Sequence, residues 1–163
     1  PDYYRYRGSD FDGVDLVAIS DYNKGFLTFE ICSKIATTCI DKNIPLFVDS
    51  KKKDLSCFEN AILKINEIEY SQITNYPEEH KLIVTMGPEG CIYDNKQYRI
   101  KKVEVFDVCG AGDVFLASLI YKYMKHGRIE KSLDFANKAA ARSVTKFGTY
   151  VLSGKDIKEL NHE

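Results

Sequence analysis

Several features that usually identify a functional class are missing from this sequence of 163 residues. It has only three histidines, and its five cysteines are scattered, with no C-x-x-C pair among them. Structural zinc sites and disulfide frameworks need clustered or paired ligands, so this pattern argues against both. We expect free thiols in a reducing compartment.

An excess of charge and a long apolar run are missing as well. The formal net charge is −1, so the chain has no basic field to attract nucleic acid or an anionic membrane. The polar, tyrosine-rich start has no signal-peptide core, and no apolar run is long enough to span a bilayer. We therefore expect a cytoplasmic protein whose partners include neither nucleic acid nor a membrane.

What the sequence does contain is the composition of a folded domain. Hydrophobic residues make up 44% and charged residues 29%, and the length suits one domain over residues 1–163. Compact apolar runs alternate with segments of helical periodicity, which predicts α/β architecture with a mostly parallel sheet. The expected strands are 14–20, 44–49, 61–65 and 81–86, followed by a hairpin over 90–100; the expected helices are 29–42, 111–126 and 130–146.

Polar residues follow the ends of the predicted strands. They are Asp21, Asp49, Asn66, Thr85 and the loop at Gly110. In parallel α/β sheets ligands bind at the carboxyl ends of the strands. We therefore expect these positions to share one edge of the sheet and to include the functional site.

The segment GAGD, residues 110–113, separates an apolar, β-branched run from a predicted helix. Glycines allow a tight turn, and the N–H groups of a helix start attract anions. A carboxylate there would repel a phosphate unless Asp113 accepted a proton from a group attacking that phosphate. The alternative is an ordinary helix entrance whose acidic residue complements the helix dipole. The chain contains neither a Walker A loop nor a G-x-G-x-x-G motif.

Three other segments each allow a functional and a structural interpretation. TMGPEG, residues 85–90, suits a nucleotide site or a plain turn. In NEIE, Asn66 and Glu69 could hold Mg²⁺ through water or form a capping box. Small residues in ANKAAARSVTKFGT, residues 136–149, could admit a flat adenine or allow close helix packing.

Taken together and in this order, the motifs DYNKG, VDSK, NEIE, TMGPEG, EVFDVCGAGD and ANKAAARSVTKFGT resemble the carboxy-terminal part of the ribokinase, or PfkB, family of sugar kinases. The resemblance runs from about Val14 to Leu160. In detail it is most similar to the heptose 7-phosphate kinases of that family. It implies a ribokinase-like three-layer αβα fold, incomplete at the amino-terminal side, with ATP and Mg²⁺ as cofactors and a sugar or sugar phosphate as substrate.

The resemblance also assigns roles to individual residues. Asp113 would be the catalytic base, and the amides of Gly110, Ala111 and Gly112 would stabilise the developing charge. The remaining implied roles are nucleotide binding by Thr85, Gly87, Gly90 and Asn137, metal binding by Asn66 and Glu69, substrate binding by Asp21 and Lys24, and phosphate contacts by Lys51 and Lys64.

Two departures from the family pattern bear on function. Cys109 replaces a common threonine and places a thiol beside the anion site. The chain begins near the middle of a family member, so the sugar-binding strands and lid have no counterpart in it. We therefore expect self-association or pairing with the absent amino-terminal half. The alternative to a kinase is a non-catalytic remnant or interaction module that binds nucleotide without turnover.

Overall fold

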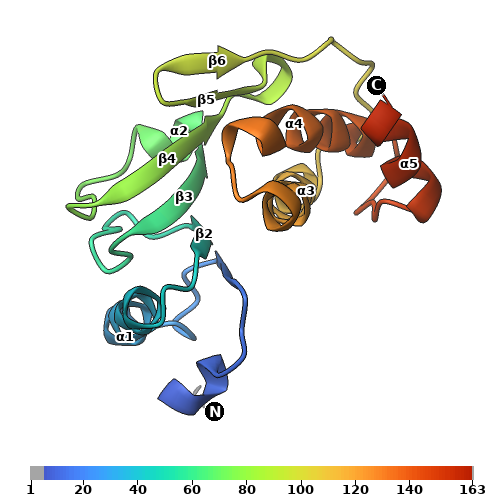
Figure 1. Cartoon of the computed structure of the whole chain (residues 1–163). Helices are drawn as coiled ribbons and strands as arrows, with labels where there is room; N and C mark the ends of the chain where they lie inside the picture. Colours follow the sequence, from blue (N-terminus) through green and yellow to red (C-terminus); the bar gives the residue numbers. More distant parts are fainter. Residues whose placement is uncertain (1–5, 163) are drawn as a thin grey trace. The chain divides into compact units, whose positions relative to one another are not determined.

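The computed structural model describes residues 6–162, and its contacts divide these into two compact units, one ending at Val84 and the other beginning at Thr85. Figure 1 shows the helices and strands of both units. Within each unit the strands follow one another in the sheet in the order in which they occur along the chain. No helix in this part of the chain combines the length and apolar character needed to cross a membrane.

The first unit is built on parallel strands. β1 (Val17–Asp21) pairs with β2 (Leu46–Ser50), which pairs with β3 (Ala61–Asn66); β4 spans His80–Thr85. All five residues of β2 are buried, as expected for a strand covered on both faces. The predicted strands therefore form, with boundaries shifted by one to three residues.

Helix α1 (Phe29–Asp41) begins where the sequence predicts. The side chain of its N-cap, Thr28, accepts a hydrogen bond from Ile31 N at 3.2 Å. Its apolar face contributes Cys32, Ile35 and Cys39 to a core shared with the strands. The remaining elements of this unit are short: η1 (Gly8–Phe11) and α2 (Glu67–Tyr70).

The second unit contains a hairpin and three helices. After η2 (Gly87–Glu89), β5 (Cys91–Tyr93) pairs antiparallel with β6 (Lys96–Tyr98) around the turn expected near Asp94. Asp94 and Asn95 both have positive φ, which asparagine and aspartate tolerate better than most residues. The predicted helices correspond to α3 (Ala111–His126) and α4 (Glu130–Val144), which lie side by side in Figure 1.

The sequence analysis did not predict α5 (Gly154–His162), which packs against α4. Its start is held by a reciprocal pair: Ser153 Oγ accepts from Asp156 N at 3.2 Å, and Asp156 Oδ2 accepts from Ser153 N at 2.8 Å. The sequence S-x-x-D at 153–156 is the signal that could have revealed it. Phe135, Ala139 and Leu160 form the small core between these helices.

Candidate functional site

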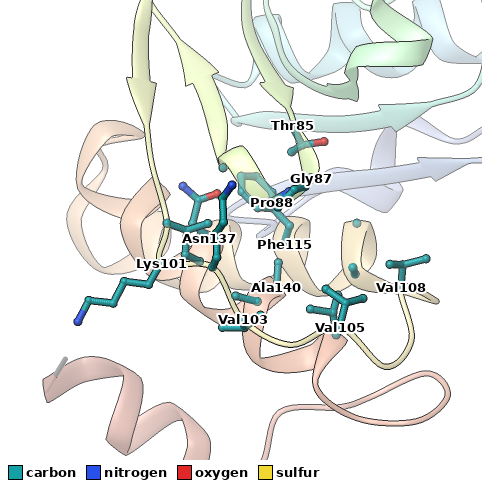
Figure 2. Close-up of a pocket in the computed structure, with 17 residues that line it drawn as sticks. Thr85, Gly87, Pro88, Lys101, Val103, Val105, Val108, Phe115, Asn137 and Ala140 are labelled. Atoms are coloured by element: carbon teal, nitrogen blue, oxygen red, sulfur yellow. The ribbon is translucent and has the colours of Figure 1, made fainter.

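A cavity of about 250 Å³ lies within the second unit and is lined from four segments. Figure 2 shows side chains converging on it from the end of β4 and η2, from the stretch 100–108, and from α3 and α4. The lining residues are Thr85, Gly87, Pro88, Gly90, Ile100, Lys101, Lys102, Val103, Val105, Val108, Ala111, Gly112, Phe115, Asn137, Ala140, Ala141 and Val144.

The chemistry of this lining is mostly apolar. Val103, Val105, Val108 and Phe115 supply aliphatic and aromatic surface, and Ala140 adds a small side chain. A cavity with apolar walls and few polar groups suits a flat aromatic ring.

The small residues of α4 divide between two roles. Ala140 and Ala141 line the cavity, whereas Ala136 and Ala139 are fully buried in the packing of the second unit. Close helix packing is therefore observed at Ala136 and Ala139, and the adenine interpretation stays a prediction for Ala140 and Ala141.

The TMGPEG turn brings Thr85, Gly87 and Gly90 to the cavity. Gly90 has φ 88°, and a Cβ at this position would lie 2.0 Å from the carbonyl oxygen of Tyr98. Gly87 also has a positive φ of 51°, but a Cβ there would meet nothing within 4 Å. The hairpin therefore requires glycine at position 90, whereas a Cβ at position 87 would lie in open space.

Asn137 reaches the cavity from α4 with its side chain almost completely buried. Its amide Nδ2 donates to Tyr98 O at 2.8 Å and lies 3.6 Å from Cys91 Sγ. Burial raises the pKa of the Cys91 thiol to about 11, so this sulfur stays protonated and uncharged at neutral pH. The amide group therefore fixes α4 to β6 as well as lining the cavity.

The GAGD turn has left-handed backbone at Gly110, with φ 74°, and a Cβ there would lie 3.1 Å from Thr149 Cγ2. Ala111 and Gly112 line the apolar cavity, and Ala111 N donates to Val108 O at 3.2 Å. Asp113 and Gly110 instead line a second, more open cavity of about 360 Å³. The first turn of α3 thus contributes to two cavities.

The second cavity is bounded by three helices and one loop of the same unit. Its remaining lining residues are Val114, Ala117, Ser118 and Tyr121 from α3, Phe135 from α4, Thr149, Tyr150, Val151 and Leu152 from the loop, and Ile157 from α5. The carboxylate of Asp113 is one of few polar groups among mainly apolar neighbours.

Asp107 was overlooked at the sequence level. Its Oδ1 accepts from Cys109 N at 2.8 Å, and its Oδ2 accepts from Gly148 N at 2.9 Å. These backbone N–H groups, that of Cys109 first, hold the pKa of the Asp107 carboxyl below its usual range. The signal was an aspartate two residues before Cys109, a spacing typical of side chains that bond nearby backbone N–H groups.

In the first unit the ends of β1, β2 and β3 lie along one edge, as the strand-end rule predicts. Asp21 is buried there and accepts from Asn23 N at 2.9 Å and Ser50 Oγ at 2.9 Å, while Lys52 Nζ lies 2.9 Å from its Oδ2. Lys24 is exposed on the following loop.

The expected phosphate contacts, Lys51 and Lys64, both bind carboxylates in this structure. Lys64 Nζ is buried and donates to Asp49 Oδ2 at 2.5 Å. Lys51 Nζ lies 3.3 Å from Asp49 Oδ1 and also donates to Glu69 Oε1. Both ammonium groups are held at the ends of β2 and β3.

Asn66 and Glu69 form the capping box of α2. Asn66 Oδ1 accepts from Glu69 N at 2.8 Å, and Glu69 Oε2 accepts from Asn66 N at 2.9 Å. The structural alternative weighed for this pair is therefore present. Among the described residues no group of three or more His, Cys, Asp or Glu could hold a metal, so Mg²⁺ would rely on few protein oxygens plus water and phosphate, as it does in many nucleotide sites.

These elements define an α/β protein with the ribokinase-like fold. Phosphofructokinase-2 from Escherichia coli, solved in complex with potassium, superposes with a TM-score of 0.78 at 18% identity, over 95% of this chain and 60% of that one. Ribokinase from Thermotoga maritima gives a TM-score of 0.67 at 17% identity, over 96% and 61%.

Sequence comparison supplies the family. Residues 27–155 match the pfkB family carbohydrate kinases, and the chain belongs to that family. The bifunctional protein HldE of Campylobacter concisus is 35% identical over 166 residues, covering 88% of this chain and 35% of that protein. The HldE protein of Sulfurimonas denitrificans is 34% identical over 172 residues, with 92% and 36% covered. The chain thus spans about a third of the length of these curated relatives.

Proposed function

We propose that this chain is the nucleotide-binding and catalytic part of a kinase that transfers the γ-phosphate of ATP to a sugar hydroxyl, with a sugar phosphate such as heptose 7-phosphate as the acceptor. The observation that carries this proposal is that the first turn of α3 contributes residues to two cavities. Ala111 and Gly112 line an apolar cavity, while Asp113, in the same turn, lines a second cavity.

The apolar cavity receives the adenine ring. Its valines, Phe115 and the small Ala140 provide flat apolar contact, and the buried amide of Asn137 adds a polar group at the wall. The phosphates then extend toward the start of α3, because helix N-termini favour negative charge. Thr85 and Gly87 line the same cavity and can contact the ribose or phosphates.

Asp113 acts as the general base. A carboxylate in the first turn of a helix gives the acceptor hydroxyl a proton acceptor, and the peptide groups of Gly110 and Gly112 stabilise charge that develops on the phosphoryl oxygens. Asp107 ties the turn to the loop that follows α4 by accepting from Cys109 N and Gly148 N. Asp21 and Lys24 contact the acceptor.

Asn66 and Glu69 would hold Mg²⁺, which neutralises phosphate charge when bound. Both offer hard oxygen ligands, and the partly exposed ammonium of Lys51, which bonds Glu69, can also contact phosphates.

The test compares ATP turnover by this chain and by a chain extended upstream, with heptose 7-phosphate and simpler sugars. Asp113→Asn should lower the rate by about 10²–10⁴-fold in whichever form is active, the range of general-base catalysis, and leave ATP binding intact. Asp134→Asn is the matched control, because Asp134 is an exposed carboxylate paired with Lys138 on α4. Nucleotide binding without turnover in both forms would identify a non-catalytic binding module instead.

A further inference from the structure

Lys51 lies between two carboxylates that belong to the proposed metal site or adjoin it. Its ammonium nitrogen is 3.3 Å from Asp49 Oδ1 and also bonds Glu69 Oε1. The other oxygens of these carboxylates are occupied as well. Lys64 Nζ donates to Asp49 Oδ2 at 2.5 Å, and Asn66 N donates to Glu69 Oε2 at 2.9 Å. A metal that used Glu69 would therefore share an oxygen with a donor already bound to it, either the Lys51 ammonium or the Asn66 N–H.

The partners differ in how easily they can leave. Lys64 extends from β3, and its side chain is 4% exposed, so its ammonium cannot leave Asp49 without entering an apolar core or opening the sheet. The Asn66 N–H belongs to the capped start of α2. The side chain of Lys51 is 36% exposed and follows the last residue of β2. Its four-carbon stem lets the ammonium swing into water while the backbone stays in place.

Charge balance points to the same residue. The carboxylates of Asp49 and Glu69 and the ammonium groups of Lys51 and Lys64 together carry no net charge. Adding a divalent cation beside both lysines would create an excess of two positive charges, and departure of Lys51 would halve that excess. Like charges at this range repel, so binding of the metal and retention of Lys51 oppose one another.

We propose that Lys51 is a built-in counter-ion that occupies the gap between Asp49 and Glu69 until Mg²⁺ binds, and that metal binding displaces its ammonium. This inference rests on the proposed function of Asn66 and Glu69 as metal ligands. It assigns Lys51 a positioning role toward the site: it keeps two carboxylates neutralised and correctly placed in the metal-free protein, and it lowers their affinity for metal without nucleotide.

The test measures Mn²⁺ binding, with free Mn²⁺ followed by electron paramagnetic resonance, so that no catalytic activity is required. Lys51→Met removes the ammonium and keeps a stem of similar length. It should raise Mn²⁺ affinity by about fivefold, the scale of a partly exposed ion pair. Lys51→Arg keeps the charge and should bind Mn²⁺ like the unmodified chain. Lys53→Met removes an exposed lysine two residues away and should change nothing.

A second readout covers the case in which Lys51→Met loses stability. Thermal unfolding with and without Mn²⁺ should show a larger stabilisation by the metal in Lys51→Met than in the unmodified chain, because a ligand stabilises the state it binds according to its affinity. Equal or weaker Mn²⁺ binding by Lys51→Met, with binding still dependent on Glu69, would overturn the counter-ion role and leave the metal site standing. Mn²⁺ binding that survives Glu69→Gln unchanged, or no binding even with ADP present, would overturn both.

Discussion

Asp107 and Gly148 are 41 residues apart in the sequence and joined by one hydrogen bond, from Gly148 N to Asp107 Oδ2 at 2.9 Å. The same carboxylate accepts from Cys109 N at 2.8 Å. Asp107 therefore connects the turn that begins α3 with the loop that follows α4. Both segments contribute residues to the cavity lined by Asp113.

Asp107→Asn should weaken ATP binding severalfold and lower the melting temperature, because an amide has one oxygen where the carboxylate uses two. Asp134→Asn, at an exposed position on α4, should leave both quantities unchanged. Calorimetric titration with ATP and thermal unfolding measure the two effects. Unaltered affinity in Asp107→Asn would show that the turn keeps its shape without this link.

The contribution of Asp107 to stability should also depend on pH. Its folded pKa is lowered, so the stabilisation is complete above the unfolded value of about 3.9 and is lost as pH falls through the folded value. The difference in melting temperature between the unmodified chain and Asp107→Asn should therefore be full at pH 7 and shrink below about pH 4. A difference that grows on acidification would contradict this assignment.

Two glycines of the TMGPEG turn should respond differently to alanine. Gly90→Ala places a Cβ 2.0 Å from Tyr98 O at φ 88° and should destabilise by more than about 4 kcal/mol, since backbone must move. Gly87→Ala, at φ 51° in open space, should cost only about 1 kcal/mol from the left-handed conformation. Urea unfolding measures both values, and similar costs would mean that the hairpin adapts to the new methyl group.

The start of α5 should depend on its capping residues. Ser153→Ala should lower the unfolding free energy by about 1 kcal/mol, as is usual for loss of an N-cap. Asp156→Ala should cost more, because Asp156 also accepts from Tyr150 Oη at 2.7 Å and lies 3.2 Å from Arg142 Nη1. Equal effects of the two substitutions in urea unfolding would show that the bonds to Tyr150 and Arg142 add nothing.

We also expect acid to destabilise α5, because of the carboxyl group of Asp156. Hydrogen bonds from Ser153 and Tyr150 hold the pKa of the Asp156 carboxyl well below its usual range. The stabilisation is present above about pH 4 and should be lost as pH falls further toward the folded pKa. Hydrogen exchange of the α5 amides at pH 3 and pH 6, corrected for intrinsic rates, would test this. Equal protection at both values would refute it.

Cys109 should react with iodoacetamide before the other thiols. It is the exposed cysteine, 3.7 Å from Thr149 Oγ1, whereas Cys32, Cys39, Cys57 and Cys91 are buried. Because Cys109 precedes the proposed phosphate-binding turn, Mg-ATP should slow its alkylation. Peptide mapping after limited labelling gives the rates; equal labelling of all five, unaffected by nucleotide, would contradict both expectations.

Local sequence signals predicted most of the fold because they act within one element. The Thr28 cap, the alternation of apolar runs with helical periodicity, and the Asp94-Asn95 turn each correspond to an element of the structure. The boundaries moved by a few residues because hydrogen bonding between neighbouring strands, which periodicity does not encode, decides where a strand ends. The helix α5 was missed because it is short and its cap was not recognised.

The sequence by itself also determined which residue types could serve a kinase: the glycines and carboxylate of GAGD, the amide and carboxylate of NEIE, and the small residues of α4. Only the tertiary structure decided how their atoms are used. It divided the first turn of α3 between two cavities, placed the Lys51 ammonium beside Glu69, and joined Asp107 to Gly148. Each of these depends on contacts between residues that are distant along the chain, or on which carboxylate oxygen meets which donor. The spacing of residues in the sequence fixes neither the contacts nor the choice of oxygen.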